Sequence, residues 1–255
     1  MVRMWVRAVV VGCTALALTG SAPPAGPALR LAPLSATGAE ETLPPTPWRI
    51  VGLPLQTKPY TRFVLTRIDG ESALRIEADR SYGNLVHPLP AGAEVRALAW
   101  RWRVDEALPA ADITRRSTED VPLRVCMGFD LPLEAVPFLE RQIVRAARGR
   151  GPDALPLAAV CYVWNSRLAP GSELASPFTR RIRYVVLHGP EAALHTWFEE
   201  RRDVQADLLR LFADETRSAL PATAVIVGAD ADNTRGHSLA YLTDLRLSSG
   251  AAAGD

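Results

Sequence analysis

The sequence has almost no excess of charge of either sign. Its 29 lysine and arginine residues and 28 aspartate and glutamate residues give a formal net charge of +1 at pH 7. Removal of residues 1–22 would delete Arg3 and Arg7 and take that charge from +1 to −1. Binding to a phosphate backbone requires a basic surface. A nucleic acid is therefore excluded as the main partner.

The sequence also lacks the common motifs of catalysis. It has no glycine-rich phosphate loop, no nucleophile elbow and no histidine-rich zinc spacing. Of its 3 cysteines, Cys126 and Cys161 lie outside the N-terminal segment, and neither has a nearby histidine in the sequence. A thiol-based active site is therefore not expected. In an exported protein these two residues can form a disulfide or pack as free thiols, and the sequence leaves both open.

No apolar run at the N-terminus is long enough to span a bilayer, which takes about 20 residues. The run Ala8–Leu18 follows Arg3 and Arg7 and precedes small residues, a pattern typical of a secretory signal peptide over residues 1–22. A retained anchor is the alternative. We expect an exported protein, periplasmic or extracellular, with no stable membrane span after processing. Residues 23–45 are rich in proline and alanine and are predicted to be a flexible leader.

Most of the remaining sequence alternates apolar and polar residues with a period of two, which is typical of half-buried strands. The clearest case is residues 95–104, where Trp100 and Trp102 share one face with other apolar side chains. We expect both tryptophans to lie in the core. The dipeptide Asp69-Gly70 stands between two alternating runs and predicts a β-hairpin.

About ten short strands separated by turn residues predict a mainly β fold, an antiparallel two-sheet sandwich of jelly-roll type. Apolar residues at helical spacing predict a helical insertion near 133–148 and a short helix near 203–213, with Asp203 as the N-cap of the second. We expect the sandwich domain to cover residues 46–248 and a disordered tail to cover 249–255.

Several strings of residues carry a resemblance to a known family. In chain order they are Leu98–Val104 (LAWRWRV), Asp120–Asp130 (DVPLRVCMGFD), Cys161–Trp164 (CYVW), Glu200–Val204 (ERRDV), Ala229–Thr234 (ADADNT) and Ala240–Asp244 (AYLTD). Over about residues 45–248 the chain resembles the DUF3047 proteins, a bacterial family of unknown function. The family's loop typically reads Asp-Thr-Asp-Asn-Thr, and Ala231 here replaces the middle threonine, which keeps the carboxylates. The resemblance implies a shared fold and supplies no established activity, catalytic residue or ligand.

A second resemblance concerns the end of the chain. Tyr241–Leu247 (YLTDLRL) is similar to the last strand of galactose-binding-like carbohydrate-binding modules. That strand often carries an aromatic residue and an aspartate that helps to hold a structural calcium ion. For Asp244 the resemblance implies such a part, by analogy of fold.

The densest group of oxygen-bearing side chains follows Ala229. Asp230, Asp232 and Asn233 lie in this loop, and Asp244 lies in the strand after it. Carboxylates in or beside strands are costly to desolvate unless something satisfies them. Because calcium takes six to eight oxygen ligands, these four residues are candidate ligands of a structural calcium ion. The alternatives are a turn in which the side chains bind their own backbone, an ion pair with an arginine, or direct contact with a ligand.

Arginines recur on the strand faces opposite the apolar side chains. If these faces belong to one sheet, Arg101, Arg103 and Arg124, together with Asp130, form a polar concave surface. Such a surface would bind an acidic sugar or another carboxylate, because a guanidinium group matches a carboxylate bidentately. The alternative is a solvated sheet face with ion pairs to residues such as Asp120 and Asp130.

Glu200 and Asp203 are the carboxylates that we consider for catalysis. A glycosidase needs two carboxylates about 5–10 Å apart on either side of the bond. The alternative for this pair is a helix cap and an ion-pair cluster with Arg201 and Arg202.

These observations lead to three candidate functions. The first is an exported, non-catalytic β-sandwich that binds a polar ligand such as a glycan or an envelope component. The second is a glycan hydrolase or lyase that uses Glu200 and Asp203 with an arginine-lined cleft. The third is an envelope scaffold or assembly protein. The sequence fixes neither the ligand nor the oligomeric state.

Overall fold

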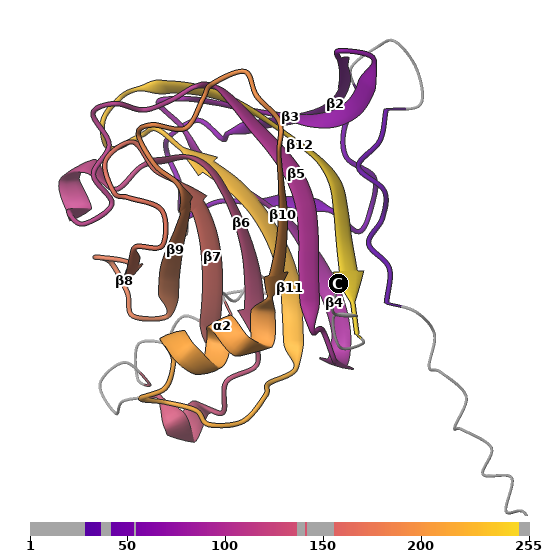
Figure 1. Cartoon of the computed structure of the whole chain (residues 1–255), viewed down its shortest axis with the longest axis vertical. Coiled ribbons are helices and arrows are strands. Elements are labelled where there is room, and N and C mark those ends of the chain that lie inside the picture. The colour runs from indigo at the N-terminus through magenta and orange to yellow at the C-terminus, as the bar shows by residue number, and fades with distance from the viewer. Residues whose placement is uncertain (1–28, 37–41, 54, 137–140, 142–155, 250–255) are drawn as a thin grey trace, which may run out of the picture.

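The fold was determined from a computed structural model, which describes residues 29–36, 42–53, 55–136, 141 and 156–249 (Figure 1). The strands are β1 (Arg49–Val51), β2 (Arg62–Ile68), β3 (Glu71–Asp79), β4 (Tyr82–Ala93), β5 (Ala97–Glu106), β6 (Val121–Phe129), β7 (Ala158–Trp164), β8 (Glu173–Ala175), β9 (Ile182–His188), β10 (Phe198–Asp203), β11 (Ala222–Asp230) and β12 (His237–Ser248). The described helices are α2 (Val204–Leu211) and two short 3-10 turns, Arg116–Thr118 and Leu133–Ala135.

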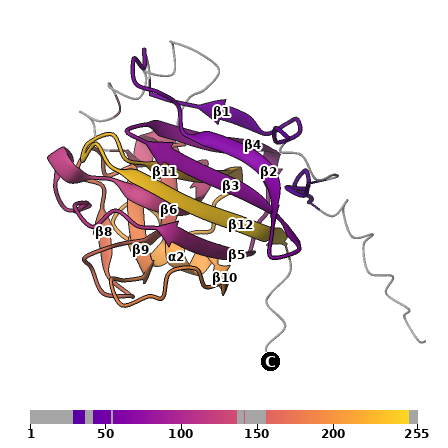
Figure 2. The ribbon, with the colours of Figure 1, turned by 90° about the horizontal axis from the view of Figure 1, so that it is seen from above.

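The strands form two sheets that face each other. One sheet has seven strands in the order β1-β4-β11-β6-β7-β9-β8, and the other has five in the order β10-β5-β12-β3-β2 (Figure 2). All pairings are antiparallel except that of β7 with β9, which is parallel. The predicted mainly β, two-sheet sandwich is confirmed.

The core between the sheets is built from alternate residues of the facing strands. Trp100 and Trp102 of β5 are fully buried, as predicted. The ring centroid of Trp100 lies 5.3 Å from that of Tyr162 on β7, and Trp102 lies 6.1 Å from Trp164 on the same strand. These two contacts join the five-stranded sheet to the seven-stranded one, and large aromatic rings bury the most apolar surface per residue.

The seven-stranded sheet is apolar on its outer face as well. Cys126, Val163 and Tyr184 on that face are buried beneath loop residues such as Ile113 and Leu168. Because β6 and β7 are covered on both faces, they are buried along their whole length. Strands of this kind carry apolar residues at consecutive positions instead of alternate ones.

Local sequence signals account for the turns and for the described helix. Asp69 and Gly70 both have positive φ angles, as the tight hairpin between β2 and β3 requires. The predicted short helix is confirmed as α2, and the side chain of Asp203 accepts a hydrogen bond of 2.9 Å from the backbone N–H of Ala206. Asp203 is therefore its N-cap, as predicted.

The helical insertion predicted near 133–148 falls largely outside the described residues. Leu133–Ala135 forms a 3-10 turn, and Val136 after it has extended backbone with φ −76° and ψ 133°. An α-helix therefore does not begin at Leu133. Runs of 3-10 helix are short because their hydrogen-bond geometry is poor, and this one covers three residues. The predicted signal peptide and the predicted tail also lie outside the described residues, apart from Ser249.

The segment 29–36, which we call the N-terminal strap, lies within the region predicted to be a flexible leader. It has no regular secondary structure, but its apolar residues Leu29, Leu31 and Leu34 pack against the main core. The sequence pattern therefore predicted the absence of helix and strand, but not the packing. No helix among the described residues is long and apolar enough to cross a membrane.

Cys126 and Cys161 form a disulfide. They are directly paired residues of the neighbouring strands β6 and β7, on the outer face of the seven-stranded sheet. The bond joins residues 35 positions apart and closes the loop between those two strands.

We expect this disulfide to stabilise the fold by about 3–4 kcal/mol, the loop-closure value for a ring of this size. Replacement of both cysteines by alanine should lower the free energy of unfolding by about that amount, measured in urea under oxidising conditions. Dithiothreitol should destabilise the native chain and leave the double variant unchanged. Equal stability of the two proteins would show that the bond contributes nothing.

Candidate functional site

The acidic loop between β11 and β12 is held by hydrogen bonds from its own backbone. Asp120, at the start of β6, accepts from the N–H of Asn233 at 3.1 Å and from the N–H of Thr234 at 2.6 Å. The Nδ2 group of Asn233 donates to the carbonyl of Glu119 at 2.9 Å. The loop is therefore fixed to the strand beside it, and Asp120 acts as its cap.

Asp230, at the end of β11, lies in a buried ion pair. Its Oδ2 atom is 2.9 Å from the guanidinium group of Arg124, and its Oδ1 atom accepts from the N–H of Val121 at 2.8 Å. The same guanidinium group donates to the Oδ1 atom of Asn84 at 3.0 Å and lies over the ring of Tyr82. The Arg124 and Asp230 side chains are only 8% and 3% exposed.

More carboxylates surround this pair than there are cations to balance them. Glu119 accepts hydrogen bonds from the hydroxyls of Tyr184 and Ser176 nearby, and Lys58 is bound to Asp232. Burial raises the pKa of Asp230 to about 7, against the attraction of Arg124 and with repulsion from Glu119 and Asp120. Burial likewise raises the pKa of Glu119. We call this group of residues on the outer face of the seven-stranded sheet the buried network.

Three carboxylates of this region come close together. Asp120, Asp230 and Asp232 each have one carboxylate oxygen that lies within 4.8 Å of the others. The sequence predicted Asp230, Asp232 and Asn233 here. It expected Asp120 only as an ion-pair partner of an arginine, because nothing in the pattern before β6 relates it to a loop more than a hundred residues later.

The structure does not bring Asp244 to this loop. Asp244 lies seven residues after His237 in β12, which is about 23 Å along the strand at a rise of about 3.3 Å per residue. It is bound instead to Arg101, at 3.5 Å. The calcium site predicted from sequence therefore loses one of its four ligands, and two of the other three, Asp230 and Asp232, are already paired with Arg124 and Lys58.

The arginines predicted to share one surface lie on two. Arg101 and Arg103 point outward from β5 in the five-stranded sheet, where Arg103 is bound to Asp69 and Asp105. Arg124 belongs to the buried network on the opposite side of the sandwich. Asp130, just past the end of β6, is exposed and joins neither group. The predicted single concave arginine surface does not form, because β5 and β6 belong to different sheets.

Glu200 and Asp203 do not share a site either. Glu200 accepts from Trp102 Nε1 at 3.2 Å and is 2.6 Å from the Nε2 atom of His188. Asp203 caps α2 and forms an ion pair of 2.7 Å with Arg96. Both carboxylates are occupied by partners within the fold, and neither lines a described hollow.

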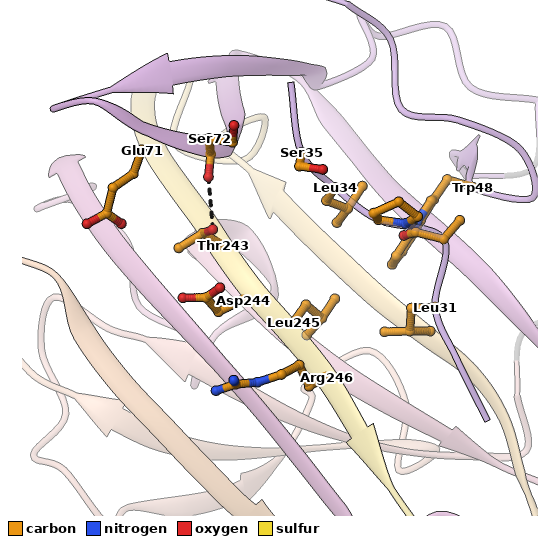
Figure 3. Close-up of a pocket in the computed structure, with 12 residues that line it drawn as sticks. Leu31, Leu34, Ser35, Trp48, Glu71, Ser72, Thr243, Asp244, Leu245 and Arg246 are labelled. Atoms are coloured by element: carbon orange, nitrogen blue, oxygen red, sulfur yellow. Dashed lines mark hydrogen bonds between the residues drawn. The ribbon is translucent and has the colours of Figure 1, made fainter. Parts of the chain in front are cut away.

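A hollow of about 490 Å³ lies beside β12. Its lining residues are Leu31, Ala32, Pro33, Leu34, Ser35, Trp48, Glu71, Ser72, Thr243, Asp244, Leu245 and Arg246. Figure 3 shows Glu71 and Asp244 on one side of the hollow, and Leu31, Leu34 and Trp48 on the other. One side therefore offers charged oxygen atoms, and the other is apolar.

A β-bulge in β12 places Asp244 at this hollow. Thr243 pairs with Arg101 of β5, but Arg246 pairs with Ala99, so β12 contains one residue more than its partner. Asp244 has a φ angle of 52° at this point. The extra residue lets Leu245 pack on the core, although it follows Leu242 by an odd number of positions. Bulges commonly redirect a side chain next to a functional site.

The charged groups at the hollow form an accessible network. Arg101, beside it on β5, is bound to Glu71 at 2.8 Å as well as to Asp244. The side chains of Glu71 and Asp244 are 46% and 47% exposed, against 3% for Asp230 in the buried network. Sequence analysis missed Glu71, Trp48 and the N-terminal strap, because they come from segments that meet β12 only in the folded chain.

These features define a class of protein: a two-sheet β-sandwich with a polar hollow on its smaller sheet. A family model described as "Protein of unknown function (DUF3047)" matches residues 46–246, and the chain belongs to this family. The comparison with curated proteins found no match.

Two solved structures match this chain over most of its length. One is a carbohydrate-binding module, TmCBM61, in complex with β-1,4-galactotriose. It is 10% identical with a TM-score of 0.33, and the match covers 79% of this chain and 88% of that one. The other is the xyloglucanase domain of NopAA, a type three effector from Sinorhizobium fredii, in complex with cellobiose. It is 8% identical with a TM-score of 0.40, and the match covers 79% of this chain and 92% of that one.

We expect calcium to leave the melting temperature unchanged. Lys58 and Arg124 already neutralise Asp232 and Asp230, and a calcium ion would have to displace both cations. The measurement is thermal unfolding in calcium and in a chelator, with elemental analysis of the purified protein. A rise of several degrees in calcium would restore the predicted metal site, because a ligand that binds only the folded state stabilises it.

Arg124→Met should destabilise the fold by about 3–5 kcal/mol at about pH 8, because it leaves buried carboxylates without their cation. The loss should be smaller at about pH 5. Since the folded-state pKa of Asp230 is raised to about 7, its carboxyl is protonated there and no ion pair remains to be lost. Urea unfolding at both pH values measures the difference.

The matched control for this prediction is Arg115→Met. Its side chain is 75% exposed and pairs with Asp112 three residues earlier, so its removal should cost less than about 1 kcal/mol at either pH. A loss for Arg124→Met that is the same at both pH values would contradict the raised pKa of Asp230.

Proposed function

We propose that this protein is an exported β-sandwich that binds a neutral glycan in the hollow beside β12. The observation that carries the proposal is the division of the hollow into an apolar side and a side of exposed, paired charges. Ligand sites are concave and mostly apolar, with a few convergent polar groups that fix orientation. A hollow of about 490 Å³ lies within the usual size of such sites.

A sugar fits the chemistry of this hollow. A pyranose ring has an apolar face of C–H groups and an edge of hydroxyls that both donate and accept hydrogen bonds. Leu31 and Leu34 can receive the apolar face, beside the largely buried ring of Trp48 (Figure 3). The carboxylates of Glu71 and Asp244 accept from hydroxyls, and charge-assisted hydrogen bonds of this kind are about twice as strong as neutral ones.

The charges at the hollow favour a neutral ligand over an acidic one. Glu71 and Asp244 carry two negative charges, and Arg101 and Arg246 carry two positive ones, so the group is balanced. Arg101 is bound to both carboxylates and would have to give up that pairing for a uronic acid. The buried network offers no comparable access, because the side chains of Asp230 and Asp232 are only 3% and 6% exposed.

Export is the second part of the proposal. The basic residues and short apolar run at the N-terminus support it. The disulfide between Cys126 and Cys161 also supports it, because such bonds persist mainly in oxidising compartments.

We expect Asp244→Asn to weaken glycan binding about tenfold, the effect of losing a hydrogen bond to a charged group. Asparagine has nearly the same shape and tolerates a positive φ angle, so the bulge should be kept. Calorimetry with neutral β-linked galacto- and gluco-oligosaccharides, and with uronic acid oligosaccharides for comparison, measures the affinity. Absence of binding by the native chain to every neutral oligosaccharide tried would overturn the proposal.

Asp69→Asn is the matched control. Asp69 also has a φ angle of 52° and is bound to Arg103, the next outward arginine of β5, but it does not line the hollow. Its replacement should change affinity less than about twofold. Equal weakening by the two variants would show that the binding surface is the whole outer face and not the hollow.

A further inference from the structure

The N-terminal strap forms one wall of the hollow. Five of its residues, 31–35, are among the twelve that line the hollow. The strap comes from outside the part of the chain that matches the family model, which begins at residue 46. What attaches the strap to the sandwich therefore decides whether this wall of the hollow is in place.

Among the described residues, three hydrogen bonds hold the strap. The N–H of Ala32 donates to the Nε2 atom of His87 at 3.1 Å. The Nε1 group of Trp48 donates to the carbonyl of Ala32 at 2.8 Å. Ser72 donates through its hydroxyl to the carbonyl of Ala36 at 3.3 Å. Two of the three therefore meet at Ala32.

The bond to His87 requires a neutral imidazole in one tautomer. Its Nδ1 atom lies 2.9 Å from the carbonyl of Pro88, so Nδ1 carries the proton and donates there. The Nε2 atom then has the lone pair that accepts from Ala32. A second proton would go to Nε2 and place two N–H groups against each other at that contact.

We propose that His87 makes the attachment of the strap dependent on pH, so that protonation of its ring releases the strap and opens one wall of the hollow. The effect of this release on ligand binding rests on the function proposed above. The release of the strap itself does not depend on that function.

The surroundings of the ring oppose its protonation in the attached state. His87 is 5% exposed, and its ring packs edge-on against Trp48 with centroids 4.9 Å apart. Burial lowers the pKa of His87, and the carbonyls of Pro88 and His87 offset this only in part. The strap contact Ala32 N–H adds a donor, which also disfavours the imidazolium form.

No charged side chain is among the described contacts of the ring. Val225 lies opposite His87 on β11, and the charged residues on the elements around it are Arg30 of the strap, Arg49 of β1, and Glu71, Asp244 and Arg246 at the hollow. Arg30 and Arg49 are exposed.

The sign of the pH effect follows from the lowered pKa. A histidine whose pKa is lowered by attachment of the strap favours attachment fully above the ordinary value of about 6.5. That contribution is lost as the pH falls through the lowered pKa. The strap should therefore be attached at neutral and alkaline pH and released under acidic conditions.

Hydrogen exchange of the purified protein tests this without any ligand. Peptides that cover residues 29–36 are compared at about pH 8 and about pH 5, each corrected by the exchange of the unfolded chain at the same pH. We expect the protection factor of the strap amides to fall about tenfold or more at the lower pH. Loss of one buried hydrogen bond corresponds to a change of about this size. Peptides from β2 and β3 serve as the internal control and should stay protected.

Two variants identify the group responsible. His87→Gln keeps an acceptor that does not titrate, and it should hold the strap equally at both pH values. Ala32→Pro removes the donating N–H, and it should loosen the strap at both pH values. Strap protection that is the same at both pH values in the native chain, or a pH-dependent loss that persists in His87→Gln, would overturn the proposal.

The oligosaccharide titration separates the two proposals. Strap release at low pH without oligosaccharide binding at high pH would leave the strap mechanism standing and remove the proposed function. Binding that is unaffected at a pH where the exchange shows the strap released would show that this wall is not part of the site.

Discussion

The contact on which the rest of the structure depends is the packing of two tryptophans of β5 against two aromatic residues of β7. Trp100 meets Tyr162 and Trp102 meets Trp164, so each sheet is fixed to the other through an interior strand. Because all four rings are buried there, polar residues of β5 must point to the outer face, and this places Arg101 beside the bulge of β12. The candidate site is thus a consequence of how the core is filled.

The two outer faces have become different kinds of surface. On the seven-stranded sheet, loops and a disulfide cover the face, and the charges left there are satisfied within the buried network. Such a network favours one arrangement of the strands, since each carboxylate oxygen that lost its partner would be left in a low-dielectric interior. On the five-stranded sheet the charges remain accessible, and only there do they lie beside an apolar wall.

Protons act on the buried network and on the attachment of the strap in opposite directions. Burial raises the pKa of Asp230 and Glu119 in the buried network, so acid relieves their mutual repulsion. Burial lowers the pKa of His87, so acid disturbs the strap. The fold as a whole can therefore remain intact at a pH where the wall of the hollow opens, which is the condition for a local response to pH instead of general unfolding.

The sequence by itself determined the elements whose causes are local. Alternation predicted the strands and the buried tryptophans, Asp69-Gly70 predicted a hairpin, and Asp203 predicted a helix cap, because each depends on residues a few positions apart. Only the tertiary structure decided which of these elements meet. It separated Arg124 from Arg101, removed Asp244 from the acidic loop, and laid the strap along β12, since pairing between distant strands is set by the packing of the whole core and leaves no periodic trace in the chain.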